Sequence, residues 1–379
     1  MNAALKHWKE AATLIVTAGR RVRAPQAAGP APHLARRSGC DYDVLLLKRS
    51  GKSGFMPNAY VFPGGLVDPS DFSDEWLDIF ESFRNAPNFG LRSVKQPLET
   101  RPPIFATDRH TLGSSVPGDV AFRICALRET FEECGVLLIV PKLGGAEEAR
   151  CAGDRVPRYK ANQLCSDELG RWRTLVNQDP SNFIRMCREL EVLPNIWALH
   201  EWSNWLTPEG RYGAKRFDTA FYMCCLQDVP HTLQDQKEIV RFEWSTPSEI
   251  LQSYQKQEFW IAPPQFYELS RLRRFPLLSD LHSFARRRAA EGCERWLPVG
   301  FLQDGHYISL LPGDKLYPSD SSGELKGDLR ADTQEGDDLH RIIISDAYVG
   351  TIKITITPKY DHVLPVLDPA SSETSKSHL

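Results

Sequence analysis

Three glutamates are crowded into the segment ALRETFEECGVLL, at positions 129, 132 and 133 of the chain. In an α-helix, residues three and four positions apart share a face, so this segment would place three carboxylates side by side. Like charges at this spacing destabilise a helix by roughly 0.2–0.5 kcal/mol per pair. A divalent cation would turn the repulsion into attraction, because Mg²⁺ prefers hard oxygen ligands and can polarise a bound diphosphate. Glu129, Glu132 and Glu133 are therefore candidate metal ligands and catalytic residues.

The same spacing has a simpler interpretation, because glutamate-rich helix faces are common on the solvated surfaces of proteins. Arg128 precedes the first glutamate and could hold one carboxylate through a charge-assisted hydrogen bond. On this segment alone a solvated surface is the better interpretation. The surrounding sequence favours a site.

A single helix is predicted to carry these side chains. It should begin at Gly118-Asp119, with Asp119 as the N-cap, and end at Gly135, where glycine favours a left-handed turn. A buried strand is expected at 136–140, and helices at 160–194. Further strands are predicted at 11–19, 43–50, 59–68, 193–208 and 215–226. The capping box Thr246-Pro247-Ser248-Glu249 should open helices that run to about residue 292, with short strands after them.

A second group of residues with chemical potential lies upstream, where Pro63-Gly64-Gly65 interrupts a predicted strand. Together with Arg128, the three glutamates and Gly135, this turn resembles the box G-x5-E-x7-R-E-U-x-E-E-x-G-U (U apolar) of the Nudix hydrolases. Asp71 stands at the first glutamate position after Gly65, and Thr130 stands where an aliphatic residue is usual. The intervening stretch 72–127 is far longer than the usual seven residues, so the box is split.

The resemblance implies an α/β fold: a Nudix α/β/α sandwich with a mixed sheet. The predicted domains follow from it. A Nudix domain would span 1–245, with the box divided into 64–71 and 119–136 by an insertion at 72–118. A C-terminal extension of helices and strands would span 246–365, and a loose tail would span 366–379.

The flanking segment LLLKRSGKSGFMPNAYVFPGG, residues 45–65, resembles the signature of the coenzyme A-cleaving branch of this family. This implies metal-dependent hydrolysis of the diphosphate bond of coenzyme A and acyl-coenzyme A, giving 3′,5′-ADP and (acyl-)4′-phosphopantetheine. The implied cofactor is Mg²⁺ or Mn²⁺. Two alternatives stay open: a pyrophosphatase for ADP-ribose or NAD(H), and a Nudix-fold module that binds a nucleotide without cleaving it.

The resemblance also implies roles for individual residues. Glu129 and Glu133 would bind the metal, Glu132 would be a further ligand or a base-like partner, and Arg128 would orient a glutamate. Gly64 and Gly65 would let the backbone approach metal and phosphates. Asp68 and Asp71 replace the usual glutamates with shorter side chains, which argues against direct contact with the metal.

Two further roles lie outside the box. Glu238 is a candidate general base or ligand, with an exposed loop carboxylate as the alternative. Arg49 is a candidate donor to the 3′-phosphate of the substrate, and the alternative donors are Lys48, Arg211, Lys215 and Arg216.

Bulk composition limits the partners. The formal net charge is −3, so no global basic field would recruit nucleic acid, and no apolar run reaches the eighteen residues of a membrane span. The nine cysteines are odd in number and form no C-x-x-C motif, which favours free thiols over disulfides or zinc.

Both ends of the chain resemble targeting signals. The final Ser377-His378-Leu379 resembles the peroxisomal tripeptide, which predicts an import receptor as a partner and the peroxisome as the location. The first forty residues are basic and poor in acids, as in a mitochondrial presequence. We favour the peroxisome, because 11–19 is better interpreted as the first strand of the fold.

Overall fold

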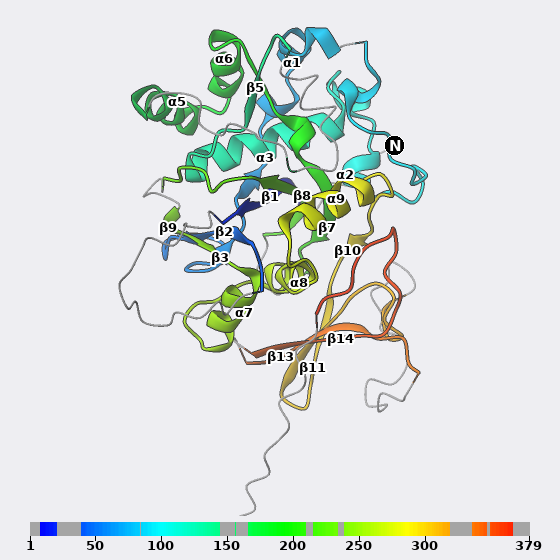
Figure 1. The fold of residues 1–379 in the computed structure, drawn as a ribbon. Coiled ribbons are helices and arrows are strands. Elements are labelled where there is room, and N and C mark those ends of the chain that lie inside the picture. The colour runs from blue at the N-terminus through cyan, green and yellow to red at the C-terminus, as the bar shows by residue number, and fades with distance from the viewer. Residues whose placement is uncertain are drawn as a thin grey trace, which may run out of the picture.

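The computed structural model describes residues 8–20, 39–83, 85–144, 156, 166–209, 215–233, 239–318, 336–346 and 349–366. Its main body is an α/β/α sandwich (Figure 1), as the sequence predicted. The central mixed sheet has the strand order β10-β7-β8-β1-β2-β3, with β4 paired to β1 and β9 paired to β2. Its strands are β1 (Lys9–Gly19), β2 (Tyr42–Arg49), β3 (Tyr60–Val61), β4 (Gly64–Leu66), β7 (His200–Leu206), β8 (Phe217–Leu226), β9 (Ile239–Ser245) and β10 (Arg295–Trp296).

The strands of the sheet form because their side chains alternate between two hydrophobic cores. On β1, Leu14 and Val16 enter one core, whereas Ile15 between them enters the other. On β8, Tyr222 and Phe221 divide in the same way. A strand buried on both faces reads as a continuous apolar run, which is why these segments were recognisable in the sequence.

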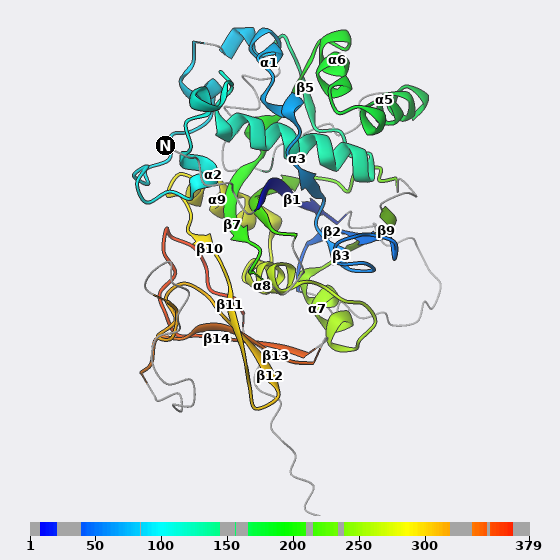
Figure 2. The same cartoon turned by 180° about the vertical axis from the view of Figure 1, so that it is seen from behind.

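Each face of the sheet is covered by its own helices (Figures 1 and 2). One layer consists of α1 (Glu75–Ile79), α2 (Pro103–Ala106), α3 (Gly118–Cys134), α5 (Ser166–Gln178) and α6 (Asn182–Glu189). The opposite layer consists of α7 (Pro247–Gln255), α8 (Pro263–Leu272) and α9 (Leu278–Arg288). The helices predicted after the capping box Thr246-Pro247-Ser248-Glu249 therefore complete the sandwich.

The segment 72–118, predicted as an insertion, leaves the sandwich and returns to the point where it started. The Ser114 hydroxyl donates to the carbonyl of Phe72 at 2.7 Å, and the Ser115 N–H donates to the Asp74 carboxylate at 2.9 Å. Between these ends the chain forms α1, α2 and the 3₁₀ turns η2 (Glu81–Phe83), η3 (Pro87–Gly90) and η4 (Arg109–Leu112). The excursion can therefore be long without separating its two flanks.

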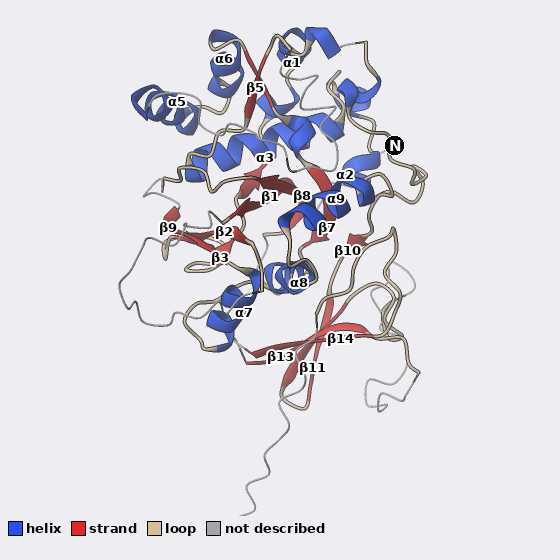
Figure 3. Cartoon of the chain, in the orientation of Figure 1, coloured by secondary structure: helices blue, strands red, loops and turns tan. Residues whose placement is uncertain are grey.

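The chain beyond α9 forms a second sheet. Strands β11 (Val299–Gln303), β12 (His306–Leu310), β13 (His340–Asp346) and β14 (Val349–Ile354) make an antiparallel meander. Figure 3 shows this sheet below the sandwich, while β10 just before it joins β7 in the main sheet. A small two-stranded sheet pairs β5 (Ile139–Pro141) with β6 (Val192–Pro194). The domain boundaries predicted at 245 and 365 stay predictions.

Three local predictions were wrong in detail. The N-cap of α3 is Pro117, and the carboxylate of Asp119 instead lies 3.5 Å from the guanidinium of Arg101. The segment predicted as a strand at 136–140 pairs only at Ile139–Pro141, and the helical stretch predicted at 160–194 is two helices followed by β6. Among the described residues, no helix is both long and apolar enough to cross a membrane.

Candidate active site

The glutamates lie on α3, a helix that is buried over most of its length. Glu133 is 5% exposed, and the side chains of Glu129 and Glu132 are 16% and 15% exposed. Gly135 ends the helix as predicted, with a left-handed φ of 71° and an N–H that donates to the carbonyl of Phe131 at 2.9 Å. The three carboxylates are therefore not a solvated helix face.

The glycine turn docks directly against these carboxylates. The backbone N–H of Gly64, on β4, donates to Glu133 Oε2 at 2.8 Å. A Cβ on Gly65 would overlap the carboxyl group of Glu129, so a side chain at this position would displace that carboxylate. The two halves of the split box therefore meet in the structure.

Arg128 joins the two halves of the box through a buried ion pair. Its Nε and Nη2 donate to the two carboxylate oxygens of Asp71 at 2.8 Å each, and both side chains are at most 2% exposed. Its Nη1 donates at 2.8 Å to Glu129 and to Glu132. Arg128 thus makes the predicted contact to a glutamate, and Asp71, doubtful as a metal ligand, binds arginine instead. Such bidentate pairs fix direction as well as charge.

Two smaller features support this geometry. The Asp68 carboxylate caps the turn η1 (Pro69–Phe72) by accepting from the N–H of Ser70 at 2.8 Å, while the Asp68 N–H donates to Asp71. Thr130, the departure from the usual box, donates its hydroxyl to the carbonyl of Ala126 at 2.7 Å. Its polar group is therefore satisfied inside the helix, so the substitution costs little.

The carboxylates have unusual proton affinities. Burial raises the pKa of Glu129 to about 7, although the neighbouring Arg128 opposes this shift. Burial also raises the pKa of Glu132, again opposed by Arg128. Buried carboxylates resist ionisation because their charged form loses hydration, and a cation beside them would reverse this effect.

The donor set fits a divalent cation of the magnesium type. Across the part of the chain that the structure describes, no group of three His, Cys, Asp or Glu side chains is arranged for a metal. Mg²⁺, however, commonly binds one or two protein carboxylates and takes its other oxygens from substrate phosphates and water. Glu129 and Glu133, both against the glycine turn, match that requirement. Metal binding by Glu132, whose carboxylate shares Arg128 Nη1 with Glu129, stays a prediction.

The raised pKa of Glu129 predicts a pH dependence of metal binding. Below pH of about 7 the carboxyl group is protonated, so binding a cation must displace the proton. The Mg²⁺ association constant should rise by up to about tenfold per pH unit below 7 and level off above it. In the metal-free protein the folded state holds this proton between the ordinary glutamate pKa of 4.5 and about 7, so the free energy of unfolding should fall as pH rises through this window.

Isothermal titration of the full chain with Mg²⁺ in buffers of differing ionisation enthalpy measures both the affinity and the protons released. The Glu129→Gln variant is the control, since it has no proton to lose. An affinity of the parent chain that does not change with pH would contradict the assignment.

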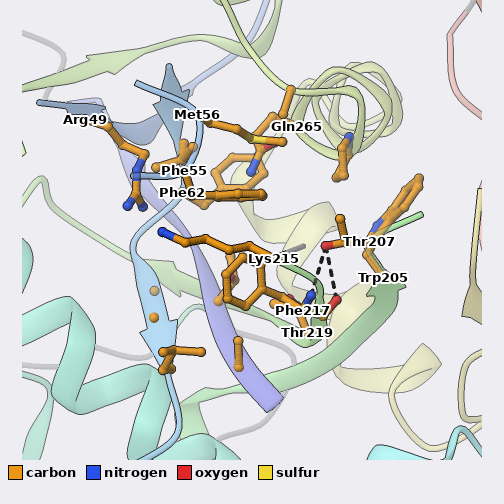
Figure 4. Close-up of a pocket in the computed structure, with 18 of the residues that line it drawn as sticks. Arg49, Phe55, Met56, Phe62, Trp205, Thr207, Lys215, Phe217, Thr219 and Gln265 are labelled. Atoms are coloured by element: carbon orange, nitrogen blue, oxygen red, sulfur yellow. Dashed lines mark hydrogen bonds between the residues drawn. The ribbon is translucent and has the colours of Figure 1, made fainter. Parts of the chain in front are cut away.

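The three carboxylates line a pocket of about 930 Å³. This pocket runs from β4 across the sheet to the C-terminal strands. Figure 4 shows Arg49 and the ammonium end of Lys215 at one end of this pocket, with Trp205 and Thr207 at the other. Arg49 donates to the Ser53 hydroxyl at 2.8 Å, and Lys215 Nζ donates to the carbonyl of Gly54 at 3.2 Å. Both cations therefore converge on the loop that follows β2.

The structure brings together most of the predicted site residues. Arg128, Glu129, Glu132, Glu133, Gly64, Gly65 and Arg49 all line this pocket. Glu238 and Arg211 lie outside the described residues. Lys48 is not among the residues that line the pocket, and its ammonium lies 5.9 Å from the ring centre of Tyr60.

Sequence reasoning missed several lining residues. Lys52 and Phe55 lie on the glycine-containing loop, and Phe55 packs edge-to-face on Phe217 with ring centres 4.8 Å apart. The sequence pointed to these two residues only through the loop that carries them. The glycines of this loop predict a flexible segment, but they do not predict where its side chains point. Trp205 on β7 is 3% exposed and also forms a pocket wall.

Comparison with known proteins agrees with this geometry. The family described as the NUDT19 Nudix domain matches residues 8–272, and the NUDT19 C-terminal domain matches residues 300–355. Three curated relatives carry the name acyl-coenzyme A diphosphatase NUDT19. The protein of Gallus gallus is 48% identical and covers 100% of both chains. That of Xenopus laevis is 45% identical over 98% of this chain and 99% of its own, and that of Homo sapiens is 42% identical over 98% and 97%.

A solved structure shows the same fold. The crystal structure of a Nudix hydrolase from Alicyclobacillus acidocaldarius superimposes with a TM-score of 0.50 at 20% identity, covering 73% of this chain and 96% of that one. Similarity at this level of identity concerns the fold alone. Because the family match spans most of the chain and the relatives align over nearly its full length, the chain belongs to the NUDT19 family of Nudix hydrolases.

Proposed function

We propose that this protein hydrolyses the diphosphate bond of coenzyme A and acyl-coenzyme A, giving 3′,5′-ADP and (acyl-)4′-phosphopantetheine. The observation that carries the proposal is one pocket in which the box carboxylates, a cationic end and an aromatic wall are continuous. At about 930 Å³, the pocket lies at the upper end of small-molecule sites, which suits a long nucleotide conjugate. The relatives named acyl-coenzyme A diphosphatase support the same substrate class.

Nudix hydrolases require a divalent cation, and we propose Mg²⁺ or Mn²⁺ for this chain. When bound, the ion polarises the phosphoryl oxygens and makes water a better nucleophile. Glu129 and Glu133 would hold it, and Gly64 and Gly65 present no side chain to compete for the space. The donor set suits either ion, because both prefer carboxylate oxygens.

The protein's own groups would then position the substrate and move the proton. Arg128 fixes one oxygen of Glu129 and one of Glu132, which leaves the second oxygen of each carboxylate for metal or water. Glu132, which Arg128 holds at the edge of the pocket through one carboxylate oxygen, could take the proton of the attacking water with the other. Glu238 stays the alternative general base.

The cationic end of the pocket predicts that the KM depends on the 3′-phosphate of the substrate. Replacing Arg49 by Met should raise the KM for coenzyme A by roughly tenfold or more, since a charge-assisted hydrogen bond contributes about 1.5–3 kcal/mol. The KM for 3′-dephospho-coenzyme A should change little, because that substrate has no 3′-phosphate to lose. Arg241→Met is the control, since Arg241 on β9 is exposed and lies outside the pocket.

Hydrolysis assays also distinguish coenzyme A cleavage from the two alternative functions, a nucleotide pyrophosphatase and a non-catalytic binding module. A substrate panel of coenzyme A, 3′-dephospho-coenzyme A, ADP-ribose and NADH with Mg²⁺ should show coenzyme A as the best substrate. Faster hydrolysis of ADP-ribose or NADH would favour the nucleotide pyrophosphatase. Binding without turnover at any divalent metal concentration would favour a non-catalytic module.

We further propose that Ser377-His378-Leu379 directs the protein to the peroxisome through its import receptor. This tripeptide lies outside the described residues, and its resemblance to the peroxisomal signal supports the proposal. A fluorescent fusion at the N-terminus should co-localise with a peroxisomal marker and lose that location when the tripeptide is removed. Mitochondrial location of a fusion at the C-terminus would support the alternative signal in the first forty residues.

A further inference from the structure

The pocket extends well beyond the box, and the register of the sheet shows how far. On its floor, Gly64 of β4 pairs with Thr13 of β1, which pairs with Phe221 of β8. Two residues along β8, Thr219 pairs with Trp205 of β7. Neighbouring strands are 4.7–4.9 Å apart and a strand rises about 3.3 Å per residue, so three steps across and two residues along place Trp205 about 16 Å from the glycine turn.

Beyond β7 the pocket wall is built by the C-terminal sheet. Tyr307 and Ser309 of β12 line the pocket, whereas Ile308 between them enters a small separate core. Tyr307 lies across its neighbouring strand at Gly300, where an added Cβ would overlap the tyrosine hydroxyl. Gly300 therefore makes the room that the Tyr307 ring occupies.

The wall between the two sheets is fixed by buried contacts. The indole N–H of Trp205 donates to Glu268 at 2.9 Å, and Glu268 is fully buried on α8. The Trp205 ring packs edge-to-face on Trp296 of β10, with centres 4.9 Å apart. Glu268 is thus a positioning residue that holds Trp205 at the junction of the sandwich and the C-terminal sheet.

The two ends of the pocket differ in charge. Arg49, Lys52 and Lys215 gather around the loop after β2, whereas Trp205 stands at the opposite end (Figure 4). Pro298 and Tyr307, from the chain that follows β10, also line the pocket. A coenzyme A ester has the same asymmetry about its diphosphate: a phosphorylated nucleoside on one side and a long, uncharged pantetheine arm with its acyl group on the other. Charge complementarity places the phosphorylated nucleoside at the cationic end of the pocket and the pantetheine arm at the opposite end.

We infer that the C-terminal domain is part of the substrate site, with Tyr307 determining specificity for the pantetheine and acyl arm. This inference rests on the proposed function, because it concerns the orientation of that substrate. The domain that follows the Nudix fold is then a wall of the pocket rather than an appendage. Contacts to this remote arm would then add to the affinity for the substrate.

Steady-state kinetics of the full chain with octanoyl-coenzyme A, and product inhibition, test the inference. Tyr307→Ala should raise the KM for octanoyl-coenzyme A by about tenfold with kcat within about twofold, since ground-state contact is lost. Inhibition by 4′-phosphopantetheine should weaken similarly, and inhibition by 3′,5′-ADP should not change. Gly300→Ala, which must displace the tyrosine hydroxyl, should give a smaller effect in the same direction.

His306→Ala is the matched control, because its exposed side chain is next to Tyr307 on β12 but projects from the opposite face. Unchanged KM in both Tyr307→Ala and Gly300→Ala, with thermal unfolding like the parent, would overturn the inference. Weaker inhibition by 3′,5′-ADP in Tyr307→Ala would overturn the orientation. Failure of the parent chain to hydrolyse any coenzyme A species would instead refute the proposed function, so the two failures are distinguishable.

Discussion

Glu133→Gln is expected to lower kcat by about 10³-fold, because it removes the charge of a proposed metal ligand. A bound metal supplies several kcal/mol of transition-state stabilisation, and about 4 kcal/mol corresponds to that factor. The substitution is nearly isosteric, and the amide oxygen can still accept the 2.8 Å hydrogen bond from the Gly64 N–H. The glycine turn should therefore keep its place, and the loss should be in chemistry rather than in folding.

The measurement is hydrolysis of coenzyme A at saturating Mg²⁺, with thermal unfolding of the same samples. Glu189→Gln is the control, since Glu189 is exposed at the end of α6 and outside the pocket. A Glu133→Gln variant that hydrolysed coenzyme A at the parent's rate would show that the carboxylates of α3 are not the catalytic ones.

Asp71→Asn is expected to lower the free energy of unfolding by about 3 kcal/mol. Removing one partner of a buried ion pair costs 3–5 kcal/mol, because the other charge stays buried without compensation. Arg128 would keep its hydrogen bonds to Glu129 and Glu132, which places the expected effect at the lower end. The variant should also lose activity, because Asp71 joins the first half of the box to the second.

Urea denaturation of the full chain, followed by tryptophan fluorescence, measures this change. Asp78→Asn is the matched control: Asp78 lies in the neighbouring α1 but is exposed, so its replacement should shift stability by less than about 0.5 kcal/mol. Equal stability of Asp71→Asn and the control would mean that the pair with Arg128 does not hold the box together.

Much of the site was predictable because its signals are local. The spacing of Glu129, Glu132 and Glu133 identifies one helix face without any knowledge of the fold, and Gly135 marks the end of that helix. The Gly64-Gly65 turn was recognisable by its residue types. Its distance along the chain was no obstacle, because the excursion closes on itself at Ser114 and Phe72.

The features that sequence reasoning missed depend on long-range pairing. Asp71 was compared with a metal ligand, whereas its partner, Arg128, lies 57 positions along the chain. Asp119 has the residue type of an N-cap, but the charge of Arg101 draws its carboxylate away. Tyr307 reaches the pocket only because β10 joins β7 and carries the C-terminal sheet to that edge. Local sequence patterns do not predict which distant strands and side chains pair.

The most direct test of the assembled split box is mass spectrometry of the products formed from coenzyme A, enzyme and Mg²⁺ in ¹⁸O-water. If water attacks a diphosphate phosphorus held between the Gly64 turn and the α3 carboxylates, the products are 3′,5′-ADP and 4′-phosphopantetheine. One of the two should carry a single ¹⁸O, and Glu133→Gln should form neither. Release of inorganic phosphate, or label in a product cut elsewhere than the diphosphate bond, would contradict this assignment.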